Sequence, residues 1–460
     1  MNGIPEKFDG YCTDVFFRES MKFMERNLET QKPFFCYLAT NAPHEPFNVE
    51  RKYRELYFQK DTDTDEYSRF CGMITNIDDN FGILRQKLRE WSIEEDTILI
   101  FMSDNGQIQI RECTKDEQYN SGMRGFKTSE YDGGHRIPFF IRYPTMNIGQ
   151  GTNQGRDVET LASYVDVMPT LLDLVAPNFK LPENHVPFHG DSLKPILLNR
   201  SKHSQGSIDW NKRIVVTDTQ RIPYPIKWRM CSVMQNKWRL VNRVELYDIQ
   251  QDPGQMNNII DQHPDVVDAL INGYEAWWEI CEMTQADDET PISIGAKQQN
   301  LTILHTHDMR NDSGDTVYSQ SQVRTGQQCY GWWEILVEQT GHYDFELRRW
   351  PNEAGHNIRE GIQGTDIDYR TQDVSPKAIS NYTGGKAVNA CTASLMLSGF
   401  QRWSKDITDN DKGATFCIYL KGGTRTQVRA FFSSDFGGRP ADDGEAFFSS
   451  PYYIYVTFRG

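Results

Sequence analysis

The sequence predicts an α/β domain followed by an all-β domain, on three observations. Apolar runs of strand length alternate with segments of helical periodicity through about the first 200 residues, as in sheets flanked by helices. After about residue 288, apolar residues recur at every second position in short segments bounded by turn residues. The 460 residues exceed what one hydrophobic core accommodates, so we expect two or three domains.

The first predicted elements are a strand, a helix and a second strand. Residues 33–40 form a continuous apolar run, residues 65–91 carry apolar side chains every three or four positions, and residues 97–103 form another apolar run. This order predicts a βαβ unit with parallel strands. Because the carboxyl ends of parallel strands meet at the ligand-binding edge of a sheet, residues after Thr40 and after Ser103 are expected to face one crevice.

Further elements follow along the chain. An apolar run over 137–143 predicts a strand, and an amphipathic segment over 158–175 predicts a helix. Short antiparallel strands are expected over 213–218 and 227–248, and a closing helix over 264–281. The expected parts are a partial α/β domain over 1–205, an antiparallel α+β subdomain over 206–288 and a β-sandwich over 289–460.

The C-terminal region alternates apolar and polar residues. The alternating segments are 333–337, 343–347, 416–420 and 452–456. No helical period of comparable length interrupts them, which predicts a sandwich of jelly-roll type. The Trp and Tyr residues of 341–351 allow two interpretations: they line a glycan-binding surface or, more ordinarily, they pack in a core.

Composition excludes some classes of function. The net charge of −15 argues against nonspecific nucleic-acid binding, although local cations can still bind a small anion. No apolar run reaches about 18 residues, so no transmembrane helix is predicted. Nine cysteines without a CxxC pair predict mostly reduced, buried thiols and leave the redox compartment open.

Three polar segments near the predicted sheet edge are candidates for chemistry. His44 lies between Pro43 and Pro46, where a rigid turn would fix the direction of its ring; an exposed histidine in a simple turn is the alternative. Asp104 and Asn105 follow the second strand and offer oxygen ligands of the kind that Ca²⁺ and Mg²⁺ take, or else form an Asx turn. Two ligands are too few for a site.

The third segment contains Lys127 in a loop punctuated by glycines, just before the strand predicted at 137–143. A lysine is most often a solvated surface charge. Glycines indicate that the backbone approaches another group closely, and a lysine held there can bind an oxyanion as a point charge. Together the three segments suit transfer of a tetrahedral oxyanion group.

An ordered set of motifs across roughly residues 8–280 resembles the sulfatase family of the alkaline-phosphatase superfamily. The matching segments are 10–14, 33–35, 42–46, 103–106, 124–127, 133–138, 164–172, 190–193, 245–248 and 252–253. The resemblance implies an alkaline-phosphatase-like α/β fold with a mixed, mostly parallel sheet flanked by helices, a small antiparallel subdomain, and a C-terminal all-β sandwich like that of some bacterial sulfatases.

The resemblance also implies roles for individual residues. Asp104 and Asn105 match calcium ligands of the family, and Lys127 matches a lysine that contacts the sulfate and the leaving oxygen. His44 matches a histidine on the sulfate that helps to protonate the leaving group. The Asp78–Asp79 pair matches a helical element, so we assign it no metal.

One family feature has no counterpart in the sequence. Sulfatases attack sulfur with a formylglycine made from Cys or Ser in a Cys/Ser-x-Pro/Ala-x-Arg motif, and no cysteine or serine here has those neighbours. The family's metal-binding Asp-Asp and a lysine–histidine pair are also missing. All belong before Gly10 in the family pattern, so we expect that the sequence is N-terminally truncated and inactive alone.

The resulting prediction is a calcium-dependent sulfuric ester hydrolase acting on a sulfated carbohydrate or an aryl sulfate ester, with no nucleic-acid or membrane partner. A phosphodiesterase or phosphonate hydrolase of the same superfamily is an alternative, although such relatives more often use histidine-rich two-metal sites. A non-catalytic glycan-binding protein is the alternative from another class. The resemblance implies a periplasmic or secreted location, and the oligomeric state stays open.

Overall fold

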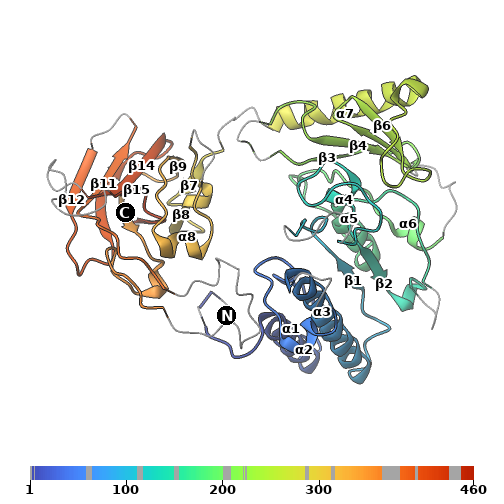
Figure 1. The fold of residues 1–460 in the computed structure, drawn as a ribbon, viewed down its shortest axis with the longest axis horizontal. Coiled ribbons are helices and arrows are strands. Elements are labelled where there is room, and N and C mark those ends of the chain that lie inside the picture. Colours follow the sequence, from blue (N-terminus) through green and yellow to red (C-terminus); the bar gives the residue numbers. More distant parts are fainter. Residues whose placement is uncertain are drawn as a thin grey trace.

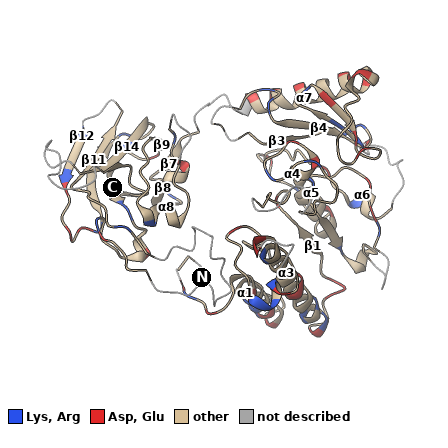
Figure 2. Ribbon diagram, viewed as in Figure 1, with Lys and Arg blue, Asp and Glu red and all other residues tan. Residues whose placement is uncertain are grey.

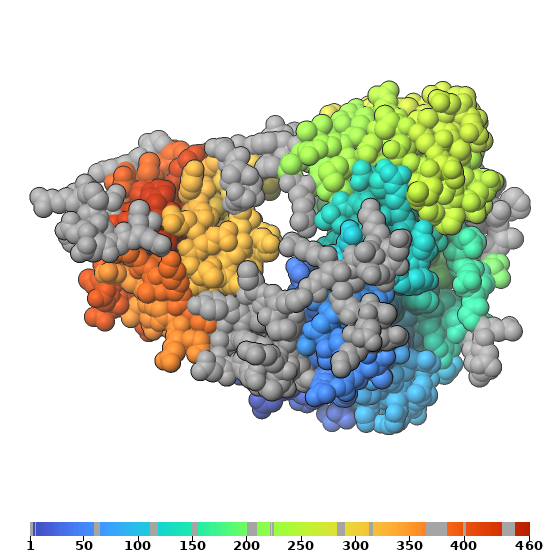
Figure 3. All heavy atoms as spheres, in the orientation of Figure 1, coloured from blue at the N-terminus to red at the C-terminus, as the bar shows by residue number. Residues whose placement is uncertain are grey.

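The computed structural model separates an N-terminal α/β part from a C-terminal all-β part (Figure 1). In Figure 3 the residues coloured yellow to red form one body, and those coloured blue to lime form another. The structure describes residues 3–4, 6–58, 65–110, 118–149, 155–199, 209–220, 222, 225–284, 290–311, 316–364, 384–398, 402–434 and 447–460.

The N-terminal residues form a helical layer. Helices α1 (Cys12–Glu29) and α3 (Asp65–Glu90) pack through a cluster that includes Phe17 and Leu88, and the short α2 (Arg51–Arg54) contacts α3. The half-buried Asp14 carboxylate on α1 accepts hydrogen bonds from Asn76 and Asn80 of α3 at 2.9 and 2.7 Å. Figure 2 shows basic and acidic segments interleaved along these helices. The helix predicted over 65–91 is confirmed.

The strands that lead into the predicted site pair differently from the prediction. Strand β1 (Leu99–Met102) pairs antiparallel with β2 (Phe139–Arg142) in a two-stranded sheet. Residues 33–40 form no strand, so the predicted parallel βαβ pairing is wrong. Physically, this run packs only one side against the helices, through residues such as Leu38, and leaves Phe35 and Tyr37 exposed, without a ladder partner among the described strands.

A second layer follows the site segments. The predicted helix over 158–175 is shorter than expected, because only Tyr164–Asp166 (a 3₁₀ turn) and α5 (Val167–Val175) are helical. The antiparallel strands and closing helix expected over 213–281 are confirmed, and α7 lies along the sheet in Figure 1. These elements are β3 (Val215–Asp218), β4 (Cys231–Gln235), β5 (Trp238–Val241), β6 (Glu245–Asp248) and α7 (Pro264–Thr284).

The remaining helices of the α/β part are single turns. They are α4 (Asp132–His135), α6 (Lys194–Leu197) and the 3₁₀ turns Pro144–Met146 and Ile260–Gln262. Such turns carry few hydrogen bonds of their own, so their positions depend on the contacts that surround them.

The C-terminal residues form two sheets, in the orders β13-β10-β16-β8 and β12-β11-β14-β9-β7, with β15 beside β14. The strands are β7 (Ile292–Ile294), β8 (Leu301–His305), β9 (Trp333–Val337), β10 (Gly341–Arg348), β11 (Thr392–Leu397), β12 (Arg402–Asp406), β13 (Ala414–Leu420), β14 (Arg425–Ser433), β15 (Phe448–Ser449) and β16 (Tyr453–Phe458). Along the chain, the 3₁₀ turn Thr306–Asp308 and helix α8 (Gln320–Thr325) lie between β8 and β9, and the 3₁₀ turn Asn352–Ala354 follows β10.

Alternate side chains of both sheets build a single core. Trp333, Tyr343 and Phe345 are fully buried in it, and Trp350 is nearly so. The aromatic residues of 341–351 therefore pack in the core, as the more ordinary interpretation holds. An α/β chain with a C-terminal all-β region is confirmed as the fold class.

Three further expectations concern the whole chain. The proposed boundaries at 205/206 and 288/289 lie outside the described residues and stay predictions. The free thiols include Cys12, Cys36, Cys231, Cys329, Cys391 and Cys417, while Cys113 lies outside the described residues. None of the helices in the described ranges combines the length and the apolar character needed to cross a bilayer.

Candidate active site

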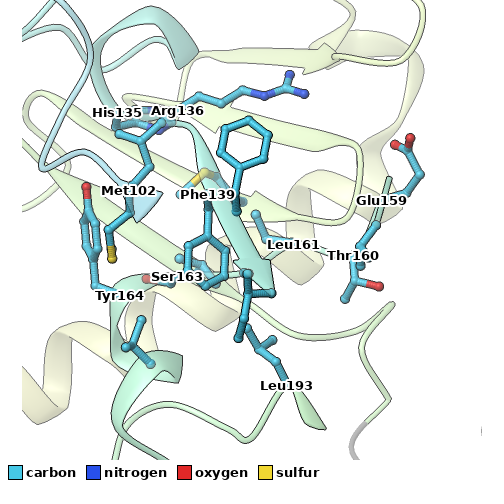
Figure 4. Close-up of a pocket in the computed structure, with 18 of the residues that line it drawn as sticks. Met102, His135, Arg136, Phe139, Glu159, Thr160, Leu161, Ser163, Tyr164 and Leu193 are labelled. Carbon is cyan, nitrogen blue, oxygen red and sulfur yellow. The ribbon is translucent and has the colours of Figure 1, made fainter. Parts of the chain in front are cut away.

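A cavity of about 1840 Å³ opens beside β1 and β2, and three of the four predicted site residues line it: Asp104, Asn105 and Lys127. Figure 4 looks into its interior, where Phe139, Leu161 and Leu193 contribute apolar side chains. The structure thus brings these three residues together at one cavity, and their roles as site residues stay a prediction. His44 does not line this cavity.

Asp104 and Asn105 sit in the turn that ends β1. The Ser103 hydroxyl donates to the backbone carbonyl of Asn105 at 3.0 Å, and the Asn105 side-chain amide donates to the Gly106 carbonyl at 2.8 Å. The Tyr164 hydroxyl donates to the backbone carbonyl of Asp104. The Ser103 hydroxyl also lies 3.4 Å from Oδ1 of Asp104. The oxygens of the turn that could bind a cation are therefore those of the Asp104 carboxylate and the Asn105 side-chain amide.

The glycine-rich loop packs directly on this turn. The Gly106 N–H donates to the Gly134 carbonyl at 3.0 Å, and the Lys127 N–H donates to the Gln107 carbonyl at 2.8 Å. A Cβ atom on Gly106 would lie 1.9 Å from the carbonyl oxygen of Gly133, so the two backbones approach as closely as they do because no side chain intervenes. The close approach that the glycines indicate in the sequence is confirmed.

Arg124 anchors the start of this loop to the four-stranded sheet β3-β4-β5-β6 and the segment that follows it. Its guanidinium lies 3.7 Å from the centre of the Tyr131 ring and donates to the Gln255 carbonyl at 2.9 Å and to the Tyr247 hydroxyl at 3.1 Å. Both tyrosine hydroxyls donate to the Glu245 carboxylate. Lys127, three residues after Arg124, is therefore held by contacts on both sides of its loop.

A buried ion pair fastens the other end of the loop, and sequence reasoning missed it. The Arg239 guanidinium on β5 donates to the Asp132 carboxylate at 2.9 Å, and both side chains are almost fully buried. Arg239 also donates to the carbonyls of Asn236 and Trp238. The Asp132 N–H donates to the side chain of Gln255. Asp132 opens the turn that carries Gly133 and Gly134, so this pair positions the backbone against which Asp104 and Asn105 rest.

His135 is another titratable residue that lines the cavity. Its ring is mostly buried, and burial lowers the pKa of His135 below its ordinary value, although the nearby Asp132 carboxylate acts in the opposite direction. The ring nitrogen Nε2 lies 3.2 Å from the Glu130 carbonyl. Figure 4 shows His135 and Arg136 together at one edge of the cavity. The pKa shift favours the neutral ring at neutral pH.

His44 stands apart from this cavity, on an exposed turn. Its Nδ1 atom lies 2.7 Å from the Glu45 carbonyl, which can only accept, so Nδ1 carries the proton and Nε2 is the free nitrogen. Ala42 and Phe47 on either side pack in one cluster with Ile110, which follows the Asp104–Asn105 turn. The turn that carries His44 therefore packs on the same cluster as the segment after Asp104 and Asn105, but it does not line their cavity.

The side-chain oxygens of Asp104 and Asn105 are of the type that a hard cation binds, but they are too few to complete its coordination shell. Asp104 and Asn105 supply a carboxylate and an amide oxygen, the ligand types that Ca²⁺ takes, whereas Ca²⁺ binds six to eight oxygens. Within the described ranges, no group of three or more His, Cys, Asp or Glu side chains is arranged to hold a metal. These two residues therefore supply part of a coordination shell, and the other ligands would have to be added.

Comparison with family models divides the α/β part into two overlapping matches. Residues 2–176 match the model described as Sulfatase. Residues 126–272 match the model described as N-sulphoglucosamine sulphohydrolase, C-terminal. The two matches together include Asp104, Asn105, Lys127 and the four-stranded sheet β3-β4-β5-β6.

Curated relatives match a little over half of this chain at low identity. An endo-4-O-sulfatase of Bacteroides thetaiotaomicron is 24% identical over 271 residues, which cover 53% of this chain and 50% of that protein. An N-acetylgalactosamine-6-O-sulfatase of the same organism is 25% identical over 291 residues, covering 57% and 50%. The chain spans about half the length of the curated relatives it matches.

Solved structures give the same fold. Ps i-CgsB in complex with k-i-k-neocarrahexaose superimposes with a TM-score of 0.50 at 23% identity, over 60% of this chain and 56% of that chain. At this identity the similarity establishes the fold and nothing finer.

Proposed function

We propose that this chain carries the leaving-group and metal-ligand side of a site that hydrolyses sulfate esters of carbohydrates, since residues 2–176 match the Sulfatase model and residues 126–272 match the N-sulphoglucosamine sulphohydrolase C-terminal model. The observation that carries the proposal is the shared cavity of Asp104, Asn105 and Lys127. The names of the two Bacteroides relatives, an endo-4-O-sulfatase and an N-acetylgalactosamine-6-O-sulfatase, support a sulfated carbohydrate as the substrate class. Aryl sulfates serve as assay analogues.

Each residue has a distinct role in this proposal. A Ca²⁺ ion held in part by Asp104 and Asn105 would neutralise charge on the sulfate oxygens. The Lys127 ammonium lies in the same cavity and binds a sulfate or leaving oxygen as a point charge. Cleavage of the S–O bond leaves an alkoxide that needs one proton. When a substrate reaches the exposed turn, a doubly protonated His44 ring can donate this proton from Nε2 and keep the proton on Nδ1 that bonds to the Glu45 carbonyl.

The nucleophile is a separate question. Because no Cys/Ser-x-Pro/Ala-x-Arg segment occurs among the 460 residues, we expect this chain by itself to release no nitrophenol from 4-nitrophenyl sulfate. Measurable turnover by the purified chain would refute this. Sequencing the DNA upstream of the Met1 codon addresses the same point. An in-frame motif of this type supports the enzyme, whereas a stop codon or an unrelated sequence favours a non-catalytic glycan-binding protein.

Binding tests the cavity without turnover. In titration calorimetry with 4-nitrophenyl sulfate and Ca²⁺, Lys127→Ala should weaken binding by about tenfold or more, since a hydrogen bond to a charged group contributes about 1.5–3 kcal/mol. Lys22→Ala removes an exposed lysine on α1 and is the matched control. Equal affinity of wild type and Lys127→Ala would remove Lys127 from the site. Preference for 4-nitrophenyl phosphate would favour a phosphodiesterase or phosphonate hydrolase.

Calcium binding is tested through stability. A ligand that binds the folded chain raises its melting temperature, so Ca²⁺ should stabilise the wild type and not Asp104→Ala. Asp78→Ala removes an exposed carboxylate in the middle of α3 and should keep the full response. The assignment of Asp104 fails if its variant responds to Ca²⁺ as the wild type does. We further propose a periplasmic or secreted location, and a reporter fusion checks it.

A further inference from the structure

The outer face of the five strands β12-β11-β14-β9-β7 carries exposed arginines at a fixed spacing. Arg402 on β12 and Arg429 on β14 both pair with Met396 of the strand between them, so the three residues form one row across the sheet. All three side chains are exposed. Neighbouring strands lie about 4.8 Å apart, which places the Cα atoms of the two arginines about 10 Å from each other.

Aromatic side chains adjoin both arginines on the same face. The Arg402 guanidinium lies 4.9 Å from the centre of the Phe431 ring, and Arg429 lies 4.9 Å from that of Trp332. Phe431 packs against Phe448 at 4.8 Å, and Phe448 meets Tyr330 at 6.2 Å. Tyr330 and Phe448 are 70% and 45% exposed, which is unusual for rings that could have packed in the adjacent core.

The guanidinium groups are oriented and keep most of their donors. Arg402 donates one hydrogen bond, to the Ser394 hydroxyl at 3.0 Å, and Ser394 in turn contacts Ser404. In the described part of the chain, neither Arg402 nor Arg429 forms an ion pair with a carboxylate. A guanidinium has five N–H donors in a planar fork that matches an oxyanion with two parallel hydrogen bonds.

Among the described residues, the acidic groups Glu334 and Asp406 of this face form no ion pair with Arg402 or Arg429. Glu334 accepts a hydrogen bond from Gln427 at 2.7 Å, and Asp406 lies four residues along β12 from Arg402, or about 13 Å. The chain as a whole carries a net charge of −15, so a cationic face is a local departure from its average. An overall negative protein repels polyanions except where such a face meets them.

We propose that this face, made of Arg402, Arg429, Trp332, Phe431, Phe448 and Tyr330, binds a sulfated polysaccharide at a second site, remote in sequence from the cavity. The arginines bind sulfate groups bidentately, and the rings stack on the apolar faces of the sugars. The choice of a sulfated glycan rests on the proposed function, while the binding of a polyanion rests on the face alone. Such a site would hold the chain on a polymeric substrate and raise the local concentration of sulfate esters.

The test measures binding of the full chain to dextran sulfate by fluorescence anisotropy, with uncharged dextran as the matched neutral polymer. The double variant Arg402→Ala/Arg429→Ala should weaken binding at least about tenfold, because two charge-assisted contacts are lost. Arg459→Ala, which removes an exposed arginine paired with Asp344 on the other sheet, should change affinity less than about twofold. Retained melting temperatures show that the variants fold.

Further arms separate the alternatives. Arg402→Lys/Arg429→Lys keeps the charge but loses the fork, so a partial loss of affinity supports bidentate binding. The proposal is overturned if the double alanine variant binds as the wild type, if dextran binds as well as dextran sulfate, or if single-stranded DNA of equal charge competes equally. The double alanine variant should bind 4-nitrophenyl sulfate as the wild type does, because neither arginine lines the cavity, so failure here and failure of the hydrolase proposal give different results.

Discussion

Replacing Arg239 by methionine should destabilise the α/β part strongly. Methionine matches the length of the arginine stem but leaves the Asp132 carboxylate, only 1% exposed, without its buried counter-charge and with only the solvent-exposed Arg136 nearby. Removing one partner of a buried ion pair costs about 3–5 kcal/mol, because an uncompensated charge then stays in a low-dielectric interior. Since whole domains are stable by about 5–15 kcal/mol, this loss should lower the melting temperature by many degrees.

The structure offers an internal reference and two controls for this experiment. The hydrophobic core of the sandwich shares no residue with those of the α/β part, so calorimetry should show its transition unchanged in Arg239→Met. Arg136→Met removes a half-exposed arginine 3.7 Å from the same carboxylate and should cost less than about 1 kcal/mol. Asp132→Asn combined with Arg239→Met should cost less than Arg239→Met alone. A loss below about 1 kcal/mol in Arg239→Met would refute the buried-pair argument.

Three other perturbations test separate features. Because burial lowers the pKa of His135 in the folded chain, the unfolded chain binds the proton more readily. The contribution of the neutral ring to the free energy of unfolding is full above about pH 6.5 and is lost as the pH falls toward the folded pKa. His135→Gln should therefore make the melting temperature depend less on pH between about pH 5 and pH 7. Gly106→Ala should cost about 3 kcal/mol or more in urea unfolding, whereas Gly82→Ala, with open space in the middle of α3, should stabilise by about 0.5–1 kcal/mol. Tyr37→Ser, at a ring 81% exposed, should reduce light scattering at high protein concentration; unchanged scattering would show that this run does not drive association.

Local periodicity accounts for what the sequence predicted well. The apolar spacing along 65–91 decides a helix by itself, because residues three and four apart share a face, and α3 follows it closely. The two-residue alternation after residue 288 similarly decides strands with one buried face. Both signals are contained within one element, so no distant partner is needed to interpret them.

Pairing between strands is a different matter, and residues 33–40 show why. An apolar run indicates that a segment is buried on at least one side, but it does not indicate which strand lies beside that segment. Here Leu38 and its alternate neighbours pack on α1 and α3, which satisfies half of the run without any ladder. The parallel partner assumed for it, β1, pairs instead with β2, about 40 residues further along the chain.

The site divides along the same line between local and distant information. Asp104, Asn105 and Lys127 could be predicted because a turn after a strand and glycines around a loop are local signals, and the close backbone contact at Gly106 is their structural consequence. Nothing local marks the pair of Asp132 and Arg239, which lie 107 residues apart, since a lone charged residue normally indicates solvent. Yet this pair holds the loop against which the oxygen donors rest. Its loss should therefore disturb calcium binding as well as stability, and Arg239→Met should weaken the Ca²⁺ response even under conditions where the chain remains folded.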